Sequence, residues 1–137
     1  DLKVVITVSP IRYAKYGFHG SQLSKATLLL AADRLVRQNP GIVSYFPAYE
    51  LMNDELRDYR FYEEDMLHPS SQAVEFIWQR FRAAYFGRAA EQFLEDWRPI
   101  REAHGHKPFH PDSEAHQRFL AKTEEMERRF NEKYFNS

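Results

Sequence analysis

Hydrophobic positions follow two patterns along the chain: short continuous runs, and stripes at helical spacing. Residues 2–8 form a short run that is apolar on both faces, which is typical of a buried strand in a parallel sheet. Residues 21–38 carry an apolar stripe at helical spacing, Pro40 marks the end of that helix, and residues 42–46 indicate a second strand. A strand, a helix and a strand in this order predict a right-handed parallel crossover.

Helices are the elements expected next, and from residue 88 onward the pattern has helical spacing only. A short helix is expected at residues 54–59, and a strong amphipathic helix at residues 69–86. Pro69 suits the first position of the second helix, where its missing N–H costs nothing. We therefore expect His68 at or beside the N-cap of that helix, where the positive end of the helix dipole keeps the imidazole neutral.

The last part of the chain, residues 88–137, is expected to form a hairpin of two helices. A loop at residues 104–111 separates the helices, because this stretch holds one glycine, two prolines and three histidines. Asp112 or Ser113 suits the N-cap of the last helix. We interpret the hairpin as an extension of a domain formed by residues 1–87.

The composition favours a globular protein and narrows its partners. Of the 137 residues, 15% are aromatic and 28% are charged, with 19 basic and 20 acidic side chains. This balance gives no electrostatic footprint for nucleic acid or for an anionic membrane. No apolar run reaches the roughly 20 residues that a membrane-spanning helix needs. We expect neither nucleic acid nor a membrane as a partner.

We also expect no metal and no cofactor. The chain has no cysteine, which excludes disulfides and thiolate zinc sites. Four histidines in and just after the loop at residues 104–111 suggest a metal site. Their spacing matches no recognised pattern, and no carboxylate ligand stands out. These histidines are His104, His106, His110 and His116. Exposed loop histidines are the interpretation that we prefer.

The most informative chemical pattern is a carboxylate three residues before an imidazole. Asp65 can fold back onto His68, orient its ring and stabilise the imidazolium that forms when the ring takes a proton from a nucleophile. By spacing alone, the pair also fits a surface aspartate beside a half-buried histidine. In context, Tyr-Glu-Glu-Asp-Met-Leu-His-Pro-Ser at residues 62–70 resembles the last sequence block of SGNH-type hydrolases, which carries their catalytic Asp and His.

Three stretches, in the right order, resemble the GSCFA family of bacterial proteins, which is related to those hydrolases. They are Thr-Val-Ser-Pro-Ile-Arg at 7–12, Tyr-Phe-Pro-Ala-Tyr-Glu at 45–50 and Asp-Glu-Leu-Arg-Asp-Tyr-Arg-Phe-Tyr at 54–62. The resemblance covers about residues 3–86. It implies an α/β fold, here the C-terminal half of a three-layer parallel-sheet domain of the SGNH or flavodoxin-like kind with the helical hairpin appended. It also implies that Asp65 and His68 are catalytic.

The chain departs from the family at the nucleophile. The family is named for a Gly-Ser-Cys-Phe-Ala motif whose serine aligns with the hydrolase nucleophile, but this chain has no cysteine, and its only Gly-Ser pair, at Gly20 and Ser21, is followed by Gln22. We therefore expect a C-terminal portion of a serine hydrolase or acyl-transfer domain that acts on ester bonds and is inactive alone. The alternative is a non-catalytic interaction or assembly module.

Four further residues follow the predicted strands, at the sheet edge where α/β proteins bind ligands. Ser9 lacks the small-residue elbow of a nucleophile and is followed by a proline, so we interpret it as a strand-end capping residue. Arg12 either clamps an oxygen-rich substrate or forms an ion pair with Glu50 or Asp58, and we prefer the ion pair. Tyr49 and Glu50 either line the pocket or are ordinary strand-end residues.

The expected partners are an ester substrate and a second copy of the chain. The substrate is a small molecule or a glycan ester that the sequence does not identify. A sheet that lacks its first strands has a bare edge, and bare edges pair with other chains. We therefore expect a homo-oligomer held through the exposed sheet edge or through the helices.

Overall fold

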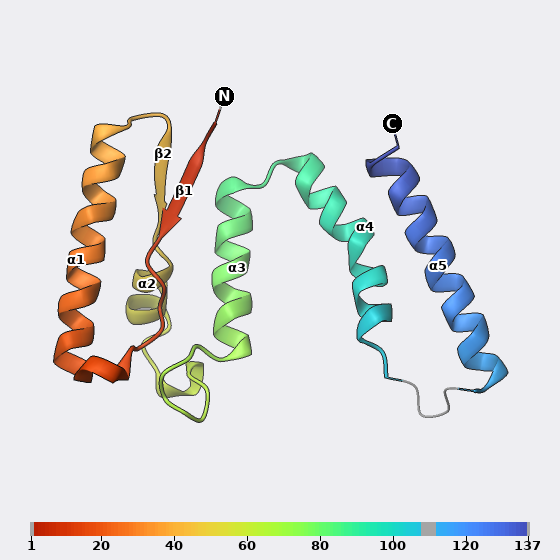
Figure 1. Cartoon of the computed structure of the whole chain (residues 1–137), viewed down its shortest axis with the longest axis horizontal. Helices are drawn as coiled ribbons and strands as arrows, with labels where there is room; N and C mark the ends of the chain where they lie inside the picture. Colours follow the sequence, from red (N-terminus) through yellow and green to blue (C-terminus); the bar gives the residue numbers. More distant parts are fainter. Residues whose placement is uncertain (1, 108–111, 137) are drawn as a thin grey trace. The chain divides into compact units, whose positions relative to one another are not determined.

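A computed structural model describes residues 2–107 and 112–136. The chain divides into two compact units, residues 1–84 and residues 85–137, which we call the N-terminal unit and the C-terminal unit. Each unit has its own set of elements, and each is described by itself (Figure 1). None of the helices in the described residues combines the length and the apolar character that crossing a membrane requires.

The N-terminal unit begins with the strand–helix–strand order that the sequence predicts. Strand β1 (Val4–Thr7) pairs in parallel with β2 (Val43–Phe46), and Val4 lies opposite Val43 in the register. Helix α1 (Gly17–Gln38) connects them and follows a single 3-10 turn, η1 (Ala14–Tyr16). Helix α1 therefore begins four residues earlier than the apolar stripe indicates, because the preceding turn feeds directly into it.

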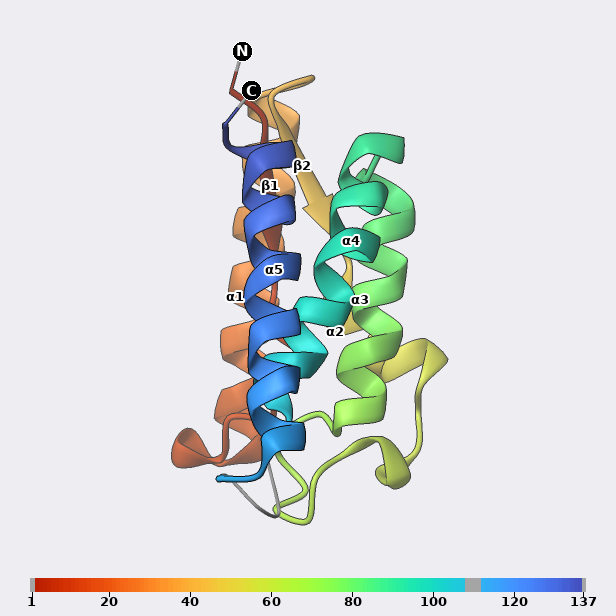
Figure 2. The same ribbon diagram turned by 90° about the vertical axis from the view of Figure 1, so that its right-hand side faces the viewer.

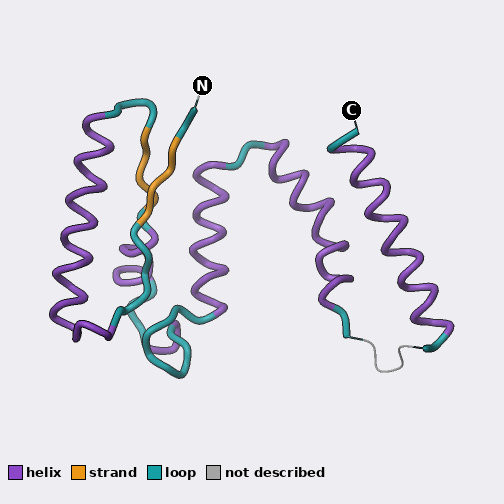
Figure 3. Tube along the Cα trace, in the orientation of Figure 1, coloured by secondary structure: helices purple, strands orange, loops and turns teal. Residues whose placement is uncertain are grey.

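The predicted three-layer parallel-sheet architecture is wrong. Over the described residues the sheet consists of β1 and β2 alone, and helices account for most of the chain (Figure 3). The physical reason lies in the sequence after β2, where the chain turns at once into α2 (Ala48–Glu50) and the π-helical turn η2 (Leu51–Glu55). Within the described residues no further strand follows β2, so the layers were an implication of the family resemblance alone.

The core of the N-terminal unit lies between the end of β2 and helix α3 (Ser71–Tyr85). Phe46 and Leu51 are buried there against apolar side chains of α3. A second cluster continues the core toward the start of α3, where Met52 and Ala73 are almost completely buried. Each large apolar side chain buried here contributes about 1.5–3 kcal/mol, so this contact fixes the position of α3 and of the loop before it.

The C-terminal unit is a hairpin of α4 (Arg88–Gly105) and α5 (Glu114–Tyr134), which run antiparallel (Figures 1 and 2). Its core is aromatic. The ring of Phe130 lies 4.9 Å from that of Phe93 and 5.1 Å from that of Trp97. The predicted cap is present, because the Ser113 hydroxyl accepts a hydrogen bond from the backbone N–H of His116 at the start of α5.

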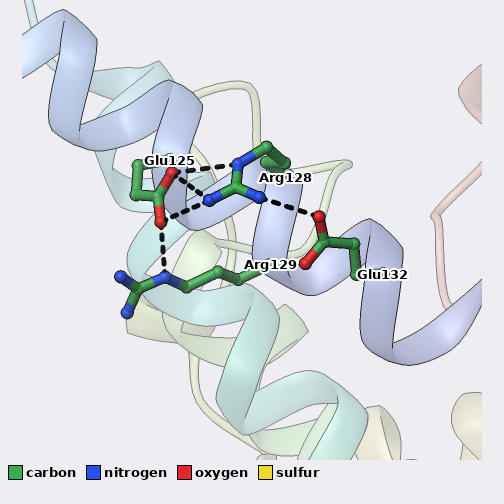
Figure 4. A network of polar contacts seen from close by, with 4 residues as sticks. All are labelled: Glu125, Arg128, Arg129 and Glu132. Atoms are coloured by element: carbon green, nitrogen blue, oxygen red, sulfur yellow. Dashed lines mark hydrogen bonds and ion pairs between the residues drawn. The ribbon is translucent and has the colours of Figure 1, made fainter.

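Helix α5 carries a charge network (Figure 4). Glu125 binds both Arg128 and Arg129, and Arg128 also binds Glu132. These pairs hold the pKa of Glu125 below its ordinary value, chiefly through the hydrogen bond from Arg128. Because all four side chains are solvent-exposed or nearly so, water and salt screen the network, and it contributes little to stability.

Candidate functional site

The Asp65–His68 loop forms the contact that the sequence predicts. Oδ2 of Asp65 lies 2.5 Å from Nδ1 of His68. Oδ1 of the same carboxylate accepts hydrogen bonds from the backbone N–H of Leu67 at 2.8 Å and of His68 at 3.0 Å. Both oxygens of one carboxylate therefore hold the imidazole and the backbone that carries it, which fixes the direction of the ring.

The charge of Asp65 determines which nitrogen of the His68 ring carries the proton. The two backbone hydrogen bonds and the contact with Nδ1, with the backbone N–H of His68 contributing most, lower the pKa of Asp65 to about 2. The carboxylate is therefore ionised at neutral pH and can only accept hydrogen bonds. A neutral His68 must then carry its proton on Nδ1, which leaves Nε2 bare and able to act as a base. The pair is open to solvent, with 57% of the His68 side chain and 44% of the Asp65 side chain exposed.

The prediction that His68 lies at or beside the helix N-cap is wrong. Helix α3 begins at Ser71, and the hydroxyl of Ser70 caps it by accepting from the N–H of Ala73. Pro69 instead pairs with Tyr62 in an antiparallel bridge that closes the loop. The helix dipole acts only over the first turn, so it has little influence on His68. The carboxylate of Asp65, rather than the helix, determines the state of the ring.

The loop contains one strained backbone position. Met66 has a φ of 60°, in the left-handed region that costs a residue with a side chain about 1–2 kcal/mol. This turn allows Asp65 to fold back onto the two N–H groups that follow it. Such strain persists only where surrounding contacts hold it. Here the N–H of Met66 donates to the Glu63 carbonyl at 2.9 Å, and Arg12 adds contacts from outside the loop.

Arg12 anchors the loop through its backbone and its side chain. Its N–H donates to the carbonyl of Leu67 at 3.0 Å, and Nη1 donates to the carbonyl of Met66 at 3.1 Å. The guanidinium also lies over the rings of Phe18, at 4.8 Å, and Tyr62, at 5.6 Å. The preferred ion pair is wrong: within the described residues, Arg12 pairs with neither of the two predicted carboxylates. It binds the Asp65–His68 loop instead.

The segment that carries Arg12 is itself held on helix α1 by two buried polar side chains. Nζ of Lys25 donates to the carbonyl of Ser9 at 2.5 Å, and the hydroxyl of Ser21 accepts from the N–H of Tyr13 at 3.2 Å. Burial lowers the pKa of Lys25. Lys25 binds the carbonyl and not the hydroxyl of Ser9, so it does not activate Ser9 as a nucleophile. The Ser9 hydroxyl accepts from the N–H of Ile11 at 3.4 Å, which agrees with the capping interpretation.

Tyr49 and Glu50 are engaged in contacts within the unit. Both oxygens of Glu50 accept from the hydroxyl of Tyr45, at 2.9 and 3.1 Å, and burial together with this carboxylate raises the pKa of Tyr45. The hydroxyl of Tyr49 donates to Oε1 of Gln22 at 3.1 Å. A role in substrate binding remains a prediction for both residues, and neither lines the cleft described next.

A polar cleft of about 320 Å³ lies beside the loop. Side chains from α1, from the η2 segment and from the turn η3 (Tyr59–Phe61) line it together with Arg12. The lining residues are Arg12, Gln22, Met52, Asn53, Arg57, Asp58, Tyr59 and Tyr62. Asp65 and His68 do not line this cleft; Arg12 and Tyr62 are the links between the two. Sequence reasoning named Asp58 only as an ion-pair partner for Arg12 and placed no cleft here, although residues 54–62 belong to a stretch that resembles the family.

The described histidines of the metal hypothesis do not form a cluster of metal ligands. Nε2 of His104 lies 2.6 Å from a carboxylate oxygen of Glu127, whereas His106 and His116 each lie against the ring of Phe119. His110 lies outside the described residues. No group of three potential ligands that could hold a metal ion occurs in the parts of the chain that the structure describes.

Comparison with known proteins gives two matches to family models. The model of the GSCFA family matches residues 1–81, and that of the GSCFA domain protein C-terminal domain matches residues 97–137. The first match includes the Asp65–His68 loop, Arg12 and the whole polar cleft. No curated protein and no solved structure matches the chain.

Proposed function

The chain belongs to the GSCFA family, and we propose that its N-terminal unit provides the acid–base half of a serine hydrolase or acyl-transfer site that acts on ester bonds. The observation that carries this proposal is the contact between Asp65 and Nδ1 of His68, which leaves Nε2 bare. The strained turn at Met66 and the contacts of Arg12 support the proposal. Backbone strain persists where surrounding contacts maintain one conformation, and such positions are common in functional sites.

In this mechanism, Nε2 of His68 takes the proton of a serine hydroxyl as the serine oxygen bonds to the ester carbonyl carbon. Asp65 stabilises the imidazolium that results. When the tetrahedral intermediate breaks down, the imidazolium returns the proton to the leaving alcohol, and an acyl-serine remains. Water, or an acceptor alcohol in acyl transfer, then attacks the acyl-serine by the same proton path and releases the serine.

The serine is proposed to come from outside the described residues. Within them, no hydroxyl group forms a hydrogen bond with His68, and Ser9 is engaged with the N–H of Ile11. The exposed pair fits this arrangement, because the segment that carries the serine would cover the ring and exclude water from it.

The test uses a fluorophosphonate probe, which labels serines that a base activates. The intact protein that the gene encodes should be labelled, and His68→Gln should abolish the labelling. Asp65→Asn should slow ester turnover by roughly 10³–10⁴-fold, since it disturbs the tautomer but not the reacting atoms. Two matched controls, His19→Gln and Glu64→Gln, change exposed side chains of the N-terminal unit and should have no effect.

Two results would contradict the proposal. One is labelling and turnover that His68→Gln leaves unchanged. The other is His68-dependent ester turnover by the 137-residue chain alone, which would show that a serine within it is the nucleophile.

A second candidate function, self-association, rests on the sheet. In the described residues β1 has a strand partner on one side only, and unpaired strand edges are templates for pairing. We propose that a second copy of the chain pairs with this edge. Light scattering at low micromolar concentration should give a dimer or a larger assembly, and a proline at the exposed Val5 should reduce it. A monomer under these conditions would exclude it.

A further inference from the structure

The polar cleft beside the Asp65–His68 loop has unused hydrogen-bonding capacity. Its volume of about 320 Å³ falls at the lower end of the range for small-molecule sites. The lining contains four uncharged polar side chains, two arginines and one carboxylate, with a single apolar residue, Met52. A cleft of this composition suits a small ligand with many hydrogen-bonding groups better than an acyl chain.

The two arginines of the cleft differ in what they bind. Arg12 is used within the protein, where its guanidinium donates to the Met66 carbonyl and lies against aromatic rings. Arg57 makes no hydrogen bond and no ion pair with any described residue, although Asp58 is its neighbour in the chain and in the cleft. An exposed arginine on a flat surface needs no explanation. An unpaired arginine in the wall of a polar cleft is available for an oxyanion of a ligand.

The uncharged side chains of the cleft also have open positions. Gln22 uses Oε1 to accept from Tyr49, and its amide N–H₂ has no partner among the described residues. Asn53 donates to the carbonyl of Tyr49 at 2.7 Å, and its Oδ1 accepts no hydrogen bond from a described residue. The hydroxyls of Tyr59 and Tyr62 likewise make no hydrogen bond with a described residue. Donors and acceptors are thus both available, which is the requirement for binding hydroxyl groups.

We propose that this cleft binds a sugar acid, that is, a hydroxyl-rich monocarboxylate ring. Arg57 pairs with the carboxylate, the amides of Gln22 and Asn53 bind hydroxyls, and the exposed ring of Tyr59 packs against the apolar face of the sugar. Asp58 accepts from a further hydroxyl. With the two arginines of the lining, its negative charge leaves the cleft one net positive charge, which matches a monocarboxylate and not the charge of about −1.5 to −2 on phosphate.

The cleft adjoins the catalytic loop through Arg12, which lines the cleft and holds the carbonyls of Met66 and Leu67. A sugar acid in the cleft therefore lies next to the loop that carries His68. That this bound unit belongs to the ester substrate rests on the proposed function. Binding in the cleft does not depend on it, because binding uses neither the imidazole nor a nucleophile.

The test is an NMR titration of the ¹⁵N-labelled chain with glucuronate, with glucose as the neutral match and inorganic phosphate as the competing anion. Glucuronate should shift the amide signals of Asn53, Arg57 and Tyr59. Glucose should bind about tenfold more weakly, the loss expected for one charge-assisted hydrogen bond at an exposed site. Arg57→Gln should reduce glucuronate binding to the level of glucose. Arg34→Gln, which changes an exposed arginine of α1 away from the cleft, should not.

Three outcomes would overturn the proposal: glucose that binds as well as glucuronate, Arg57→Gln that binds glucuronate like the unaltered chain, or phosphate that binds more tightly than glucuronate. The variant His68→Gln separates this proposal from the proposed function. It should bind glucuronate normally, so a failure of ester chemistry leaves the cleft standing. A failure of glucuronate binding with His68-dependent labelling intact would remove the cleft proposal alone.

Discussion

The contacts of Arg12 with the Asp65–His68 loop predict a measurable loss of stability when the Arg12 side chain is removed. Arg12→Ala deletes the hydrogen bond from Nη1 to the Met66 carbonyl and the contacts of the guanidinium with three aromatic rings. It leaves the backbone hydrogen bond from residue 12 to the Leu67 carbonyl in place. The substitution therefore tests the contribution of the side chain and leaves the backbone contact unchanged.

The magnitude follows from the contacts. A hydrogen bond from a charged donor is worth about 1.5–3 kcal/mol, and a cation–π contact at a partly exposed site about 0.5–1 kcal/mol. Arg12 is half-buried, so the lower part of these ranges applies, and we expect a loss of about 2 kcal/mol. With a urea dependence of about 1–3 kcal/mol per molar, the midpoint of unfolding should fall by roughly 1 M.

The assay is urea unfolding followed through amide NMR signals of residues 2–84, which report on the N-terminal unit alone. Arg12→Lys should lie between the unaltered chain and Arg12→Ala, because it keeps the charge and loses the planar fork. Arg34→Ala is the matched control on an exposed part of α1. If Arg12→Ala lowered the free energy of unfolding by less than about 0.5 kcal/mol, as the control should, the proposed anchor would be refuted.

Three further predictions concern single residues. Lys25→Met removes the donor to the Ser9 carbonyl while keeping the volume, so the N-terminal unit should lose about 1–2 kcal/mol in urea unfolding. Hydrogen bonds, above all from Lys133, lower the pKa of Asp96 to about 2, against about 3.9 in the unfolded chain. The unfolded chain therefore takes up this proton first, so the stabilisation by Asp96 is complete above about pH 4 and is lost as the pH falls toward 2; Asp96→Asn should lack this component in pH-dependent urea unfolding. Phe130→Ala should lower the free energy of unfolding of the C-terminal unit by about 3–5 kcal/mol in urea unfolding, because the residue is only 6% exposed.

Local features of the site could be predicted from the sequence. A side chain three residues before another lies within reach across a tight turn, so the contact between Asp65 and His68 needs no knowledge of the fold. The parallel pairing of residues 4–7 with residues 43–46 follows from two strand-forming runs around one helix. Both features depend on short stretches of chain, where residue type and spacing decide.

Features that depend on distant contacts could not be predicted. The sequence offered Glu50 or Asp58 as a partner for Arg12. Its partners are instead the carbonyls of Met66 and Leu67, and a sequence does not show which backbone carbonyls accept a hydrogen bond. The start of α3 shifted from Pro69 to Ser71, because Pro69 is used in a bridge with a residue seven positions earlier. Pairing of this kind overrides the local preference of proline for a helix start.

The architecture and the cleft were missed for related reasons. The layered sheet was inferred from the family resemblance, whereas the chain itself supplies only two strands over its described residues. The cleft draws Gln22 from α1 and Arg57 from a segment far along the chain, and no pattern links the two in sequence. The one available signal was a run with two arginines and two tyrosines at residues 57–62, inside a stretch that resembles the family.

The tautomer of His68 tests the central claim most directly. Long-range ¹H–¹⁵N spectra of the imidazole, recorded at a pH where the ring is neutral, distinguish a proton on Nδ1 from one on Nε2. The account predicts the Nδ1–H form in the unaltered chain and in Glu64→Gln, and the Nε2–H form in Asp65→Asn. An Nε2–H ring in the unaltered chain, or a ring that Asp65→Asn leaves unchanged, would contradict it.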